Sequence, residues 1–174
     1  MNTKKDTLFK ICISGAAETG HCGLDALDQA KALGQQVAQH GSILVTGVVT
    51  GFPMWAAIGA QEAGGTVVGF SPAASEREHK DVYRMTADHV DMPIYTGFGY
   101  MGRDLLMVRS SDAVIFGCGK IGTIHEFTVA YEEGKVMGVL QGDWETDKLL
   151  KKIVDEAHKQ NKIIIFDSDP KRLV

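Results

Sequence analysis

Residues 114–127 read VIFGCGKIGTIHEF, an apolar run followed by closely spaced glycines, a lysine, a threonine and a glutamate. Glycine permits positive φ and allows a ligand to approach the backbone closely. A helix that begins after such a turn directs free N–H groups and the positive end of its dipole toward whatever binds there. We therefore predict that an anionic group, most simply a phosphate, meets the backbone here. The candidate contacts are Gly117, Gly119, Lys120, Gly122 and Thr123.

Three other segments, residues 14–20, 46–53 and 96–103, are also rich in glycine, serine or threonine, and each follows an apolar run. The simpler interpretation of any single one is a tight turn. In a parallel sheet, however, all such loops gather at the carboxyl edge of the strands, so together they favour a ligand site. The candidate ligand contacts in these loops are Gly15, Gly47, Gly51 and Gly99.

Arg103 and Glu126 each fall in the first turn of a predicted helix. Taken alone, Arg103 is explained by a surface salt bridge, and Glu126 by electrostatic capping of its helix. We expect neighbouring strands to bring the two side chains into one crevice. There they are the candidate catalytic pair.

Short apolar runs alternate with longer amphipathic ones along the chain, which predicts βαβ units and a parallel sheet. We predict a Rossmann-like, doubly wound α/β fold over residues 1–174, a single domain with a mostly parallel sheet of about seven strands and helices on both faces. The segment 72–91 is a loop or a short helix, and the last residues are a short tail. The predicted strands are 8–14, 42–47, 65–71, 91–97, 112–117, 135–141 and 162–167, and the predicted helices are 23–40, 53–64, 100–111, 122–134 and 146–161.

The composition excludes several classes of protein. The net charge is −4 and the lysines and arginines are scattered, whereas a nucleic-acid-binding protein normally has a basic stripe. No apolar run is long enough for a membrane span or a signal peptide, so we expect a cytoplasmic protein. Cys12, Cys22 and Cys118 show no disulfide framework, which predicts reduced thiols. Because no histidine or cysteine has metal-ligand spacing, we expect no metal site.

Gly117, Gly119 and Gly122 also fit the GxGxxG fingerprint, with Asp143 about twenty residues further on as a ribose-binding acid. This alternative predicts a dinucleotide enzyme. We rank it low because the match falls at the fifth predicted strand, and little chain follows to build a second domain.

Residues 101–127 resemble the PGGxGTxxE region of the Lonely-guy family, once often named lysine decarboxylases, and of related nucleotide-binding proteins that include molybdenum-cofactor carriers. Residues 43–72 resemble the other glycine-rich segment of the family, and the resemblance extends over residues 8–140. It implies a phosphoribohydrolase that cuts the N-glycosidic bond of a nucleoside monophosphate. Arg103 would orient the substrate, and Glu126 would stabilise an oxocarbenium-like ribose or assist the water.

The resemblance also implies a homodimer or higher oligomer, with Gly119, Gly122 and Thr123 holding the phosphate. This chain departs from the motif, because Cys118-Gly119-Lys120 replaces Pro-Gly-Gly. That change affects catalysis more than binding. Our first hypothesis is therefore a binding or carrier protein for a nucleotide or phosphorylated cofactor, and the hydrolase is the alternative.

Overall fold

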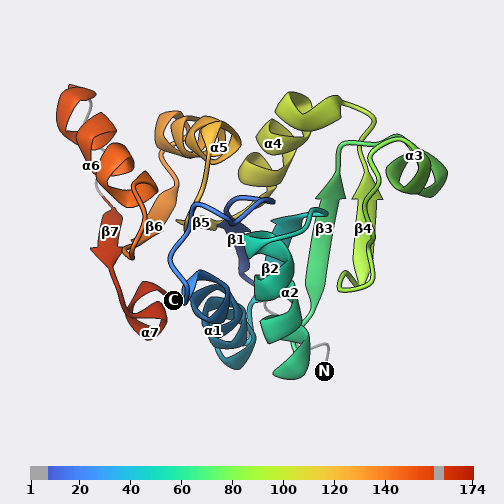
Figure 1. Ribbon diagram of the computed structural model, residues 1–174, viewed down its shortest axis with the longest axis horizontal. Coiled ribbons are helices and arrows are strands. Elements are labelled where there is room, and N and C mark those ends of the chain that lie inside the picture. The colour runs from blue at the N-terminus through green and yellow to red at the C-terminus, as the bar shows by residue number, and fades with distance from the viewer. Residues whose placement is uncertain (1–7, 159–162) are drawn as a thin grey trace, which may run out of the picture.

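The computed structural model describes residues 8–158 and 163–174 (Figure 1). Within these residues, seven strands form one sheet in the order β4-β3-β2-β1-β5-β6-β7, and all neighbouring strands are parallel. This confirms the predicted Rossmann-like α/β fold. The strands are β1 (Lys10–Ser14), β2 (Ile43–Gly47), β3 (Val67–Ser71), β4 (Met92–Tyr95), β5 (Ala113–Phe116), β6 (Val136–Leu140) and β7 (Ile164–Asp167). The helices are α1 (Ala26–Gln39), α2 (Phe52–Glu62), α3 (Glu76–Asp81), α4 (Gly99–Ser110), α5 (Ile121–Glu132), α6 (Thr146–Glu156) and α7 (Pro170–Leu173).

The sheet is covered on both faces, with α1, α2 and α7 below it and α4, α5 and α6 above it in Figure 1. Each face has its own apolar core. Adjacent side chains of the central strand β1 point into opposite cores. Ile13 packs in the core beside α1 and α2, and Cys12 packs in the core beside α4 and α5; both are fully buried. Burial on both faces explains why the strands are continuous apolar runs in the sequence.

The order of the strands creates a switch point between β1 and β5. From β1 the chain builds outward through β2 and β3 to the edge strand β4, and then returns to place β5 on the other side of β1. The loops that follow β1 and β5 therefore lead away in different directions and leave a crevice between them.

The expectation that neighbouring strands carry Arg103 and Glu126 is wrong, because β3, β2 and β1 lie between β4 and β5. What brings the two residues together is α4. This helix crosses back from the sheet edge and packs on β3, β2, β1 and α5.

Two short helices were not fixed by the sequence: α3 lies in the segment 72–91, for which a loop or a short helix was predicted, and α7 lies where a short tail was predicted. In α3, the side chain of Ser75 accepts a hydrogen bond from the backbone N–H of Glu78, and in α7 the side chain of Asp169 accepts one from that of Lys171. Both are ordinary N-caps, so the signals were present in the sequence. The predicted helix 146–161 ends at Glu156. Its last residues, 159–161, and the predicted start of the final strand at residue 162 lie outside the described residues.

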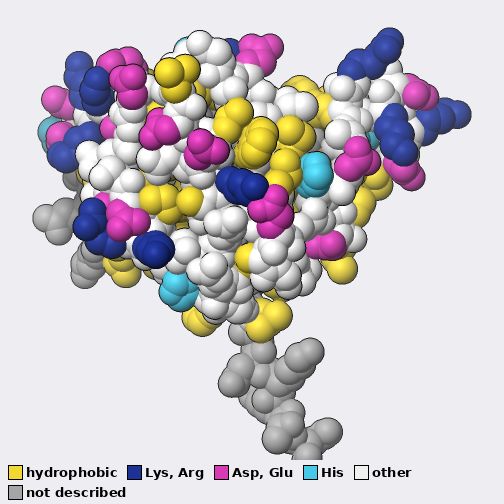
Figure 2. Space-filling view, turned by 60° about the horizontal axis from the view of Figure 1, so that its bottom comes forward, with side chains coloured by type: hydrophobic (Ala, Val, Ile, Leu, Met, Phe, Trp, Pro, Cys, Tyr) yellow, Lys and Arg dark blue, Asp and Glu magenta, His cyan; other side chains and the backbone are white. Residues whose placement is uncertain are grey.

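Basic and acidic side chains are interspersed over the face that Figure 2 shows, as the mixed charge pattern of the sequence indicates. Within the described residues, none of the helices is both long and apolar enough to span a bilayer.

Candidate functional site

A cavity of about 400 Å³ lies beyond the carboxyl ends of β1, β2 and β5. Its walls are the β1–α1 loop (15–18), the first two turns of α4 (100–107) and the start of α5 (120–126), completed by residues from the start of α2 and the loop before it. The volume is within the range of about 300–1,000 Å³ that is typical of small-molecule sites. The cavity occupies the switch point of the sheet, the usual position of a ligand in an open α/β fold.

Arg103 lies on the cavity wall with only 5% of its surface exposed. Its Nη1 atom is 3.3 Å from Oδ1 of Asp104 and 3.4 Å from Oε1 of Glu126. Its Nε atom has no hydrogen-bond partner among the described residues. A buried guanidinium N–H without a partner is uncommon in folded proteins, and here it belongs to a side chain that lines the cavity.

Gly47 makes the position of Arg103 possible. A Cβ atom at residue 47 would lie 2.2 Å from Nη1 of Arg103, which is far too close for two non-bonded atoms. The prediction gave Gly47 a role in backbone contact with a ligand. The structure places it on the cavity wall, where the absence of a side chain also leaves room for the guanidinium.

Burial and the nearby Asp104 carboxylate raise the pKa of Glu126 to about 8, against the opposing effects of Arg103 and of a hydrogen bond from Ser14. The side chains of Asp104 and Glu126 also share a hydrogen bond, which favours the protonated form of Glu126. Two buried carboxyl groups therefore flank one guanidinium, and Glu126 is mostly protonated near neutral pH. On its other side, Asp104 meets Nδ1 of His125 at 3.1 Å.

The start of α5 forms the wall opposite the β1–α1 loop. No side chain caps its first turn, which contains Gly122 and Thr123. Lys120 precedes this turn, and its Nζ atom lies 2.8 Å from Oε2 of Glu18 on the opposite loop. Lys120 lowers the pKa of Glu18 through this contact. An uncapped helix start beside a lysine is suited to an anion.

Seven of the predicted site residues line the cavity: Gly15, Gly47, Arg103, Lys120, Gly122, Thr123 and Glu126. Four others are not among its lining residues, and three of them have a local structural role. Gly51 precedes α2 with φ +69°, a conformation that favours glycine. A Cβ atom at Gly117 would lie 2.1 Å from the ring of Phe52. The N–H of Gly119 donates to Oγ1 of Thr146 at 2.9 Å, so a phosphate would have to compete for it.

The fourth, Gly99, begins α4 with φ +63° and open space around it.

Sequence reasoning missed Ser14 and Asp104. Ser14 is the last residue of a buried strand, and Asp104 follows Arg103 directly. These positions were weak sequence indications that both side chains lie at the site.

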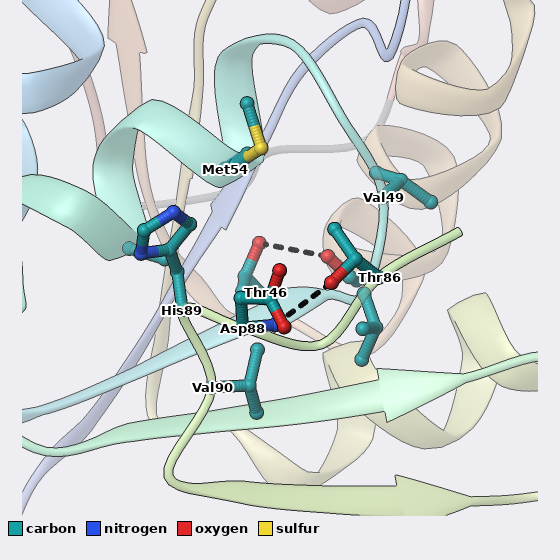
Figure 3. A pocket seen from close by; sticks show the side chains of 10 residues that line it. Thr46, Val49, Met54, Thr86, Asp88, His89 and Val90 are labelled. Atoms are coloured by element: carbon teal, nitrogen blue, oxygen red, sulfur yellow. Dashed lines mark hydrogen bonds between the residues drawn. The ribbon is translucent and has the colours of Figure 1, made fainter. Parts of the chain in front are cut away.

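Two other cavities are less suited to an organic ligand, because buried charged side chains do not line them. The one in Figure 3 lies between β2, α2 and residues 86–90, and at about 20 Å³ it holds little more than one water molecule. In it, the backbone N–H of Asp88 donates to Oγ1 of Thr86. The other, about 580 Å³, opens between the starts of α5 and α6 and is lined by surface lysines. Of these three cavities among the described residues, the one at the switch point combines a buried charge cluster with the start of α5.

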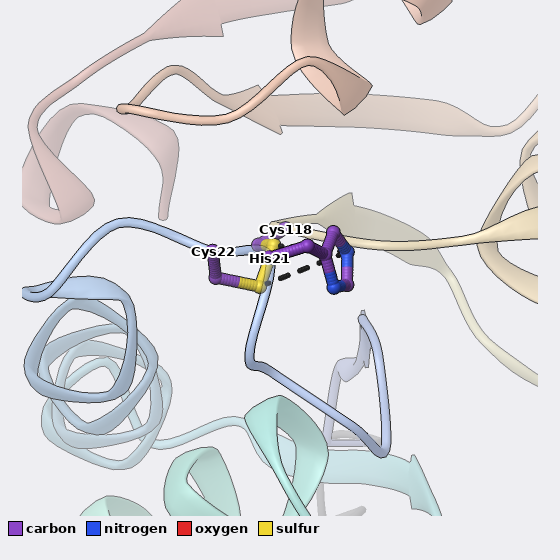
Figure 4. A group of neighbouring side chains, drawn as sticks. All are labelled: His21, Cys22 and Cys118. Atoms are coloured by element: carbon purple, nitrogen blue, oxygen red, sulfur yellow. Dashed lines mark hydrogen bonds between the residues drawn. A yellow bond between two sulfur atoms is a disulfide. The ribbon is translucent and has the colours of Figure 1, made fainter.

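The prediction of reduced thiols is wrong for two of the cysteines. A disulfide joins Cys22 and Cys118, whose Cα atoms are 5.9 Å apart, while Cys12 is a buried free thiol (Figure 4). The pair is separated by 96 residues in the sequence. It is formed because the loops after β1 and β5 meet at the switch point, a contact that cysteine spacing alone does not reveal.

The fold and the site define a Rossmann-like α/β protein with a cavity at its topological switch point. The chain belongs to the SLOG cluster4 family, whose model matches residues 8–174. This confirms the family resemblance stated from the sequence. A relative in Archaeoglobus fulgidus, an uncharacterized protein, is 31% identical over 133 residues, which are 76% of this chain and 82% of that protein.

Two solved structures share the fold over nearly their whole length. The molybdenum cofactor binding protein of the phototrophic bacterium Rippkaea orientalis has a TM-score of 0.78 and 29% identity, covering 95% of this chain and 93% of that chain. The molybdenum cofactor carrier protein of Chlamydomonas reinhardtii has a TM-score of 0.72 and 29% identity, covering 94% and 92%.

Proposed function

We propose that this protein binds a nucleotide or a phosphorylated cofactor in the switch-point cavity and serves as its carrier. The observation that carries the proposal is the cavity of about 400 Å³, which combines an uncapped helix start with a buried arginine N–H that lacks a partner. Similarity over nearly the full length to proteins that bind or carry the molybdenum cofactor supports the same class of ligand.

The phosphate is expected at the first turn of α5. The free N–H groups there and the charge of Lys120 complement a phosphate dianion. Lys120 pairs with Glu18 at the surface, an exposed contact of low strength. A bound phosphate would therefore displace Glu18 from Lys120 at small cost.

The remainder of the ligand is expected to contact the less polar walls. Pro53, Tyr100 and Met101 line the cavity away from the α5 start. Such surfaces suit a flat heterocycle, either a nucleobase or the pterin of a molybdenum cofactor.

The second candidate function is hydrolysis of a nucleoside monophosphate. It is favoured by the contact of Arg103 with Glu126 on the cavity wall, since these residues match the family's catalytic pair. A carboxylate stabilises a developing oxocarbenium ion, whereas a protonated carboxyl group does so weakly. Because the pKa of Glu126 is raised to about 8, hydrolysis by this pair should increase as the pH rises toward 8.

We also propose that the protein is a homodimer. Large apolar side chains on and beside α4 are exposed, including Phe98 at 70% and Met101 at 58%. A second copy would cover them, and light scattering of the purified protein tests this.

Binding is tested by calorimetry with inorganic phosphate, AMP, GMP and the isolated molybdenum cofactor as separate probes. We expect at least one organic probe to bind more tightly than phosphate alone. Lys120→Ala should weaken the binding of that organic probe about tenfold, because the charge-assisted contact between Lys120 and the phosphate group is lost. Lys80→Ala is the matched control, since Lys80 also forms an exposed ion pair but lies on α3. Failure of all probes, or equal binding by both variants, would contradict the proposal. Release of free base from AMP or GMP would instead support the hydrolase.

A further inference from the structure

His21, Cys22 and Cys118 form a compact cluster of metal-ligating side chains (Figure 4). One ligand atom from each lies within 4.8 Å of the other two. The Nε2 atom of His21 is 3.6 Å from Sγ of Cys118 and 3.9 Å from Sγ of Cys22. Two loops contribute, the one after β1 and the one after β5, so the cluster exists only in the folded chain.

These separations are close to those of a tetrahedral zinc site. With Zn–S about 2.3 Å and Zn–N about 2.0–2.1 Å, tetrahedral geometry puts a sulfur and a nitrogen about 3.6 Å apart and two sulfurs about 3.8 Å apart. The histidine nitrogen is at this distance from Sγ of Cys118, at 3.6 Å, and slightly further from Sγ of Cys22, at 3.9 Å. Only the sulfur–sulfur distance must grow, by about 2 Å, once the disulfide is reduced.

Local structure permits that movement. Cys22 lies between β1 and α1, in a segment that contains neither helix nor strand. Cys118 is fixed more firmly: it is fully buried, and its carbonyl oxygen accepts a hydrogen bond from the N–H of Ala16 at 2.8 Å. The His21 ring would exchange its 3.1 Å contact with the carbonyl oxygen of Gly119 for the metal.

The cluster also has an approach from solvent. His21 is exposed and lines the cavity of about 580 Å³ between the starts of α5 and α6. A cation can enter from that side, and a water molecule can complete the fourth position. Two thiolates neutralise a divalent ion, so the metal introduces no net charge.

We propose that the reduced form of the protein binds a thiophilic divalent cation such as Zn²⁺ through His21, Cys22 and Cys118. The disulfide is the metal-free, oxidised form of the same site. Its formation removes two protons and two electrons from the thiols, and a low-molecular-weight disulfide accepts them to become two thiols. A dithiol or phosphine reductant reverses the step. The proposal does not depend on which ligand the switch-point cavity takes, although both sites use the loops after β1 and β5.

Co²⁺ serves as the spectroscopic probe. The full-length protein is reduced with a phosphine, freed of reductant without oxygen, and titrated with Co²⁺ and then with Zn²⁺ as competitor. We expect one Co²⁺ per chain, with a thiolate-to-cobalt charge-transfer band and tetrahedral d–d bands that Zn²⁺ abolishes. The oxidised protein should show neither band, and this comparison needs no variant.

Variants then assign the ligands. Cys22→Ser and Cys118→Ser should each weaken binding at least about tenfold and reduce the charge-transfer intensity, and His21→Ala should weaken binding and alter the d–d bands. Cys12→Ala and His40→Ala are the matched controls, because both residues lie outside the cluster. Circular dichroism checks that each variant folds. The proposal is overturned if the reduced wild type takes up no Co²⁺, or if the charge-transfer band survives unchanged in both serine variants.

Discussion

Replacing Glu126 with glutamine tests the charge state of the buried cluster. The pKa of Glu126 is about 8 in the folded protein and near 4.5 in the unfolded chain. Between these values the unfolded chain releases the proton while the folded protein retains it. Ionisation therefore favours the unfolded state, and Glu126 lowers the free energy of unfolding as the pH rises from about 4.5 to about 8.

The size of the effect follows from the same two values. Each pH unit in this window costs about 1.4 kcal/mol, so the full cost at pH 8 is on the order of 4–5 kcal/mol for a group so deeply buried. Glutamine has nearly the shape of the protonated acid and can still accept from Ser14 and donate to Asp104, but its NH2 group then faces Nη1 of Arg103 and cannot accept from it. We therefore expect a constant loss in Glu126→Gln from this contact, and a difference from the wild type that shifts progressively in favour of the variant from pH 5 to pH 8.

The assay is urea unfolding of both proteins at each pH unit from 5 to 9, with the difference in unfolding free energy plotted against pH. Glu145→Gln is the control, because the Glu145 side chain is 86% exposed and its loss should leave the slope unchanged. The reasoning is refuted if the difference between Glu126→Gln and wild type is constant across this range, since Glu126 would then ionise alike in both states.

Two further predictions concern stability. Gly47→Ala should lower the free energy of unfolding by about 1–3 kcal/mol, because the new Cβ displaces Arg103 from its carboxyl partners, whereas Gly122→Ala, with open space around it, should be neutral or stabilising in urea unfolding. Cys118→Ser should lower the stability of the oxidised protein by up to about 4–5 kcal/mol, because the disulfide closes a loop of 96 residues. The difference should vanish when both proteins are unfolded with reductant, and its persistence there would exclude the disulfide as the cause.

The fold could be predicted from the sequence because its signals are local. A buried strand is a short apolar run and a helix has a periodic apolar face. Both patterns can be recognised in a short segment without knowledge of the rest of the fold. The helix α3 was predicted only as one of two alternatives and α7 was missed, because both are short and carry little periodicity, although Ser75 and Asp169 mark their starts.

The site was predicted less completely, because its contacts are long-range. Arg103 and Glu126 do meet, but through the path of α4 rather than through neighbouring strands. Asp104 raises the pKa of Glu126, and the sequence does not reveal that these two distant residues lie close together. The Cys22–Cys118 pair illustrates the same limit, since its partners are brought together by the strand order alone.

The two proposed sites share the loops after β1 and β5. In the structure these loops are connected by the disulfide, by the backbone bond from Ala16 to Cys118 and by the ion pair of Lys120 with Glu18. A metal ion bound by His21 and the two thiolates would replace the disulfide as a link. The cavity between the loops would then retain its walls in a reducing compartment as well as an oxidising one. In the reduced, metal-free protein the described contacts that oppose separation of the loops are weaker and noncovalent: the Ala16–Cys118 backbone bond, the Lys120–Glu18 ion pair and the contact of His21 with the carbonyl oxygen of Gly119.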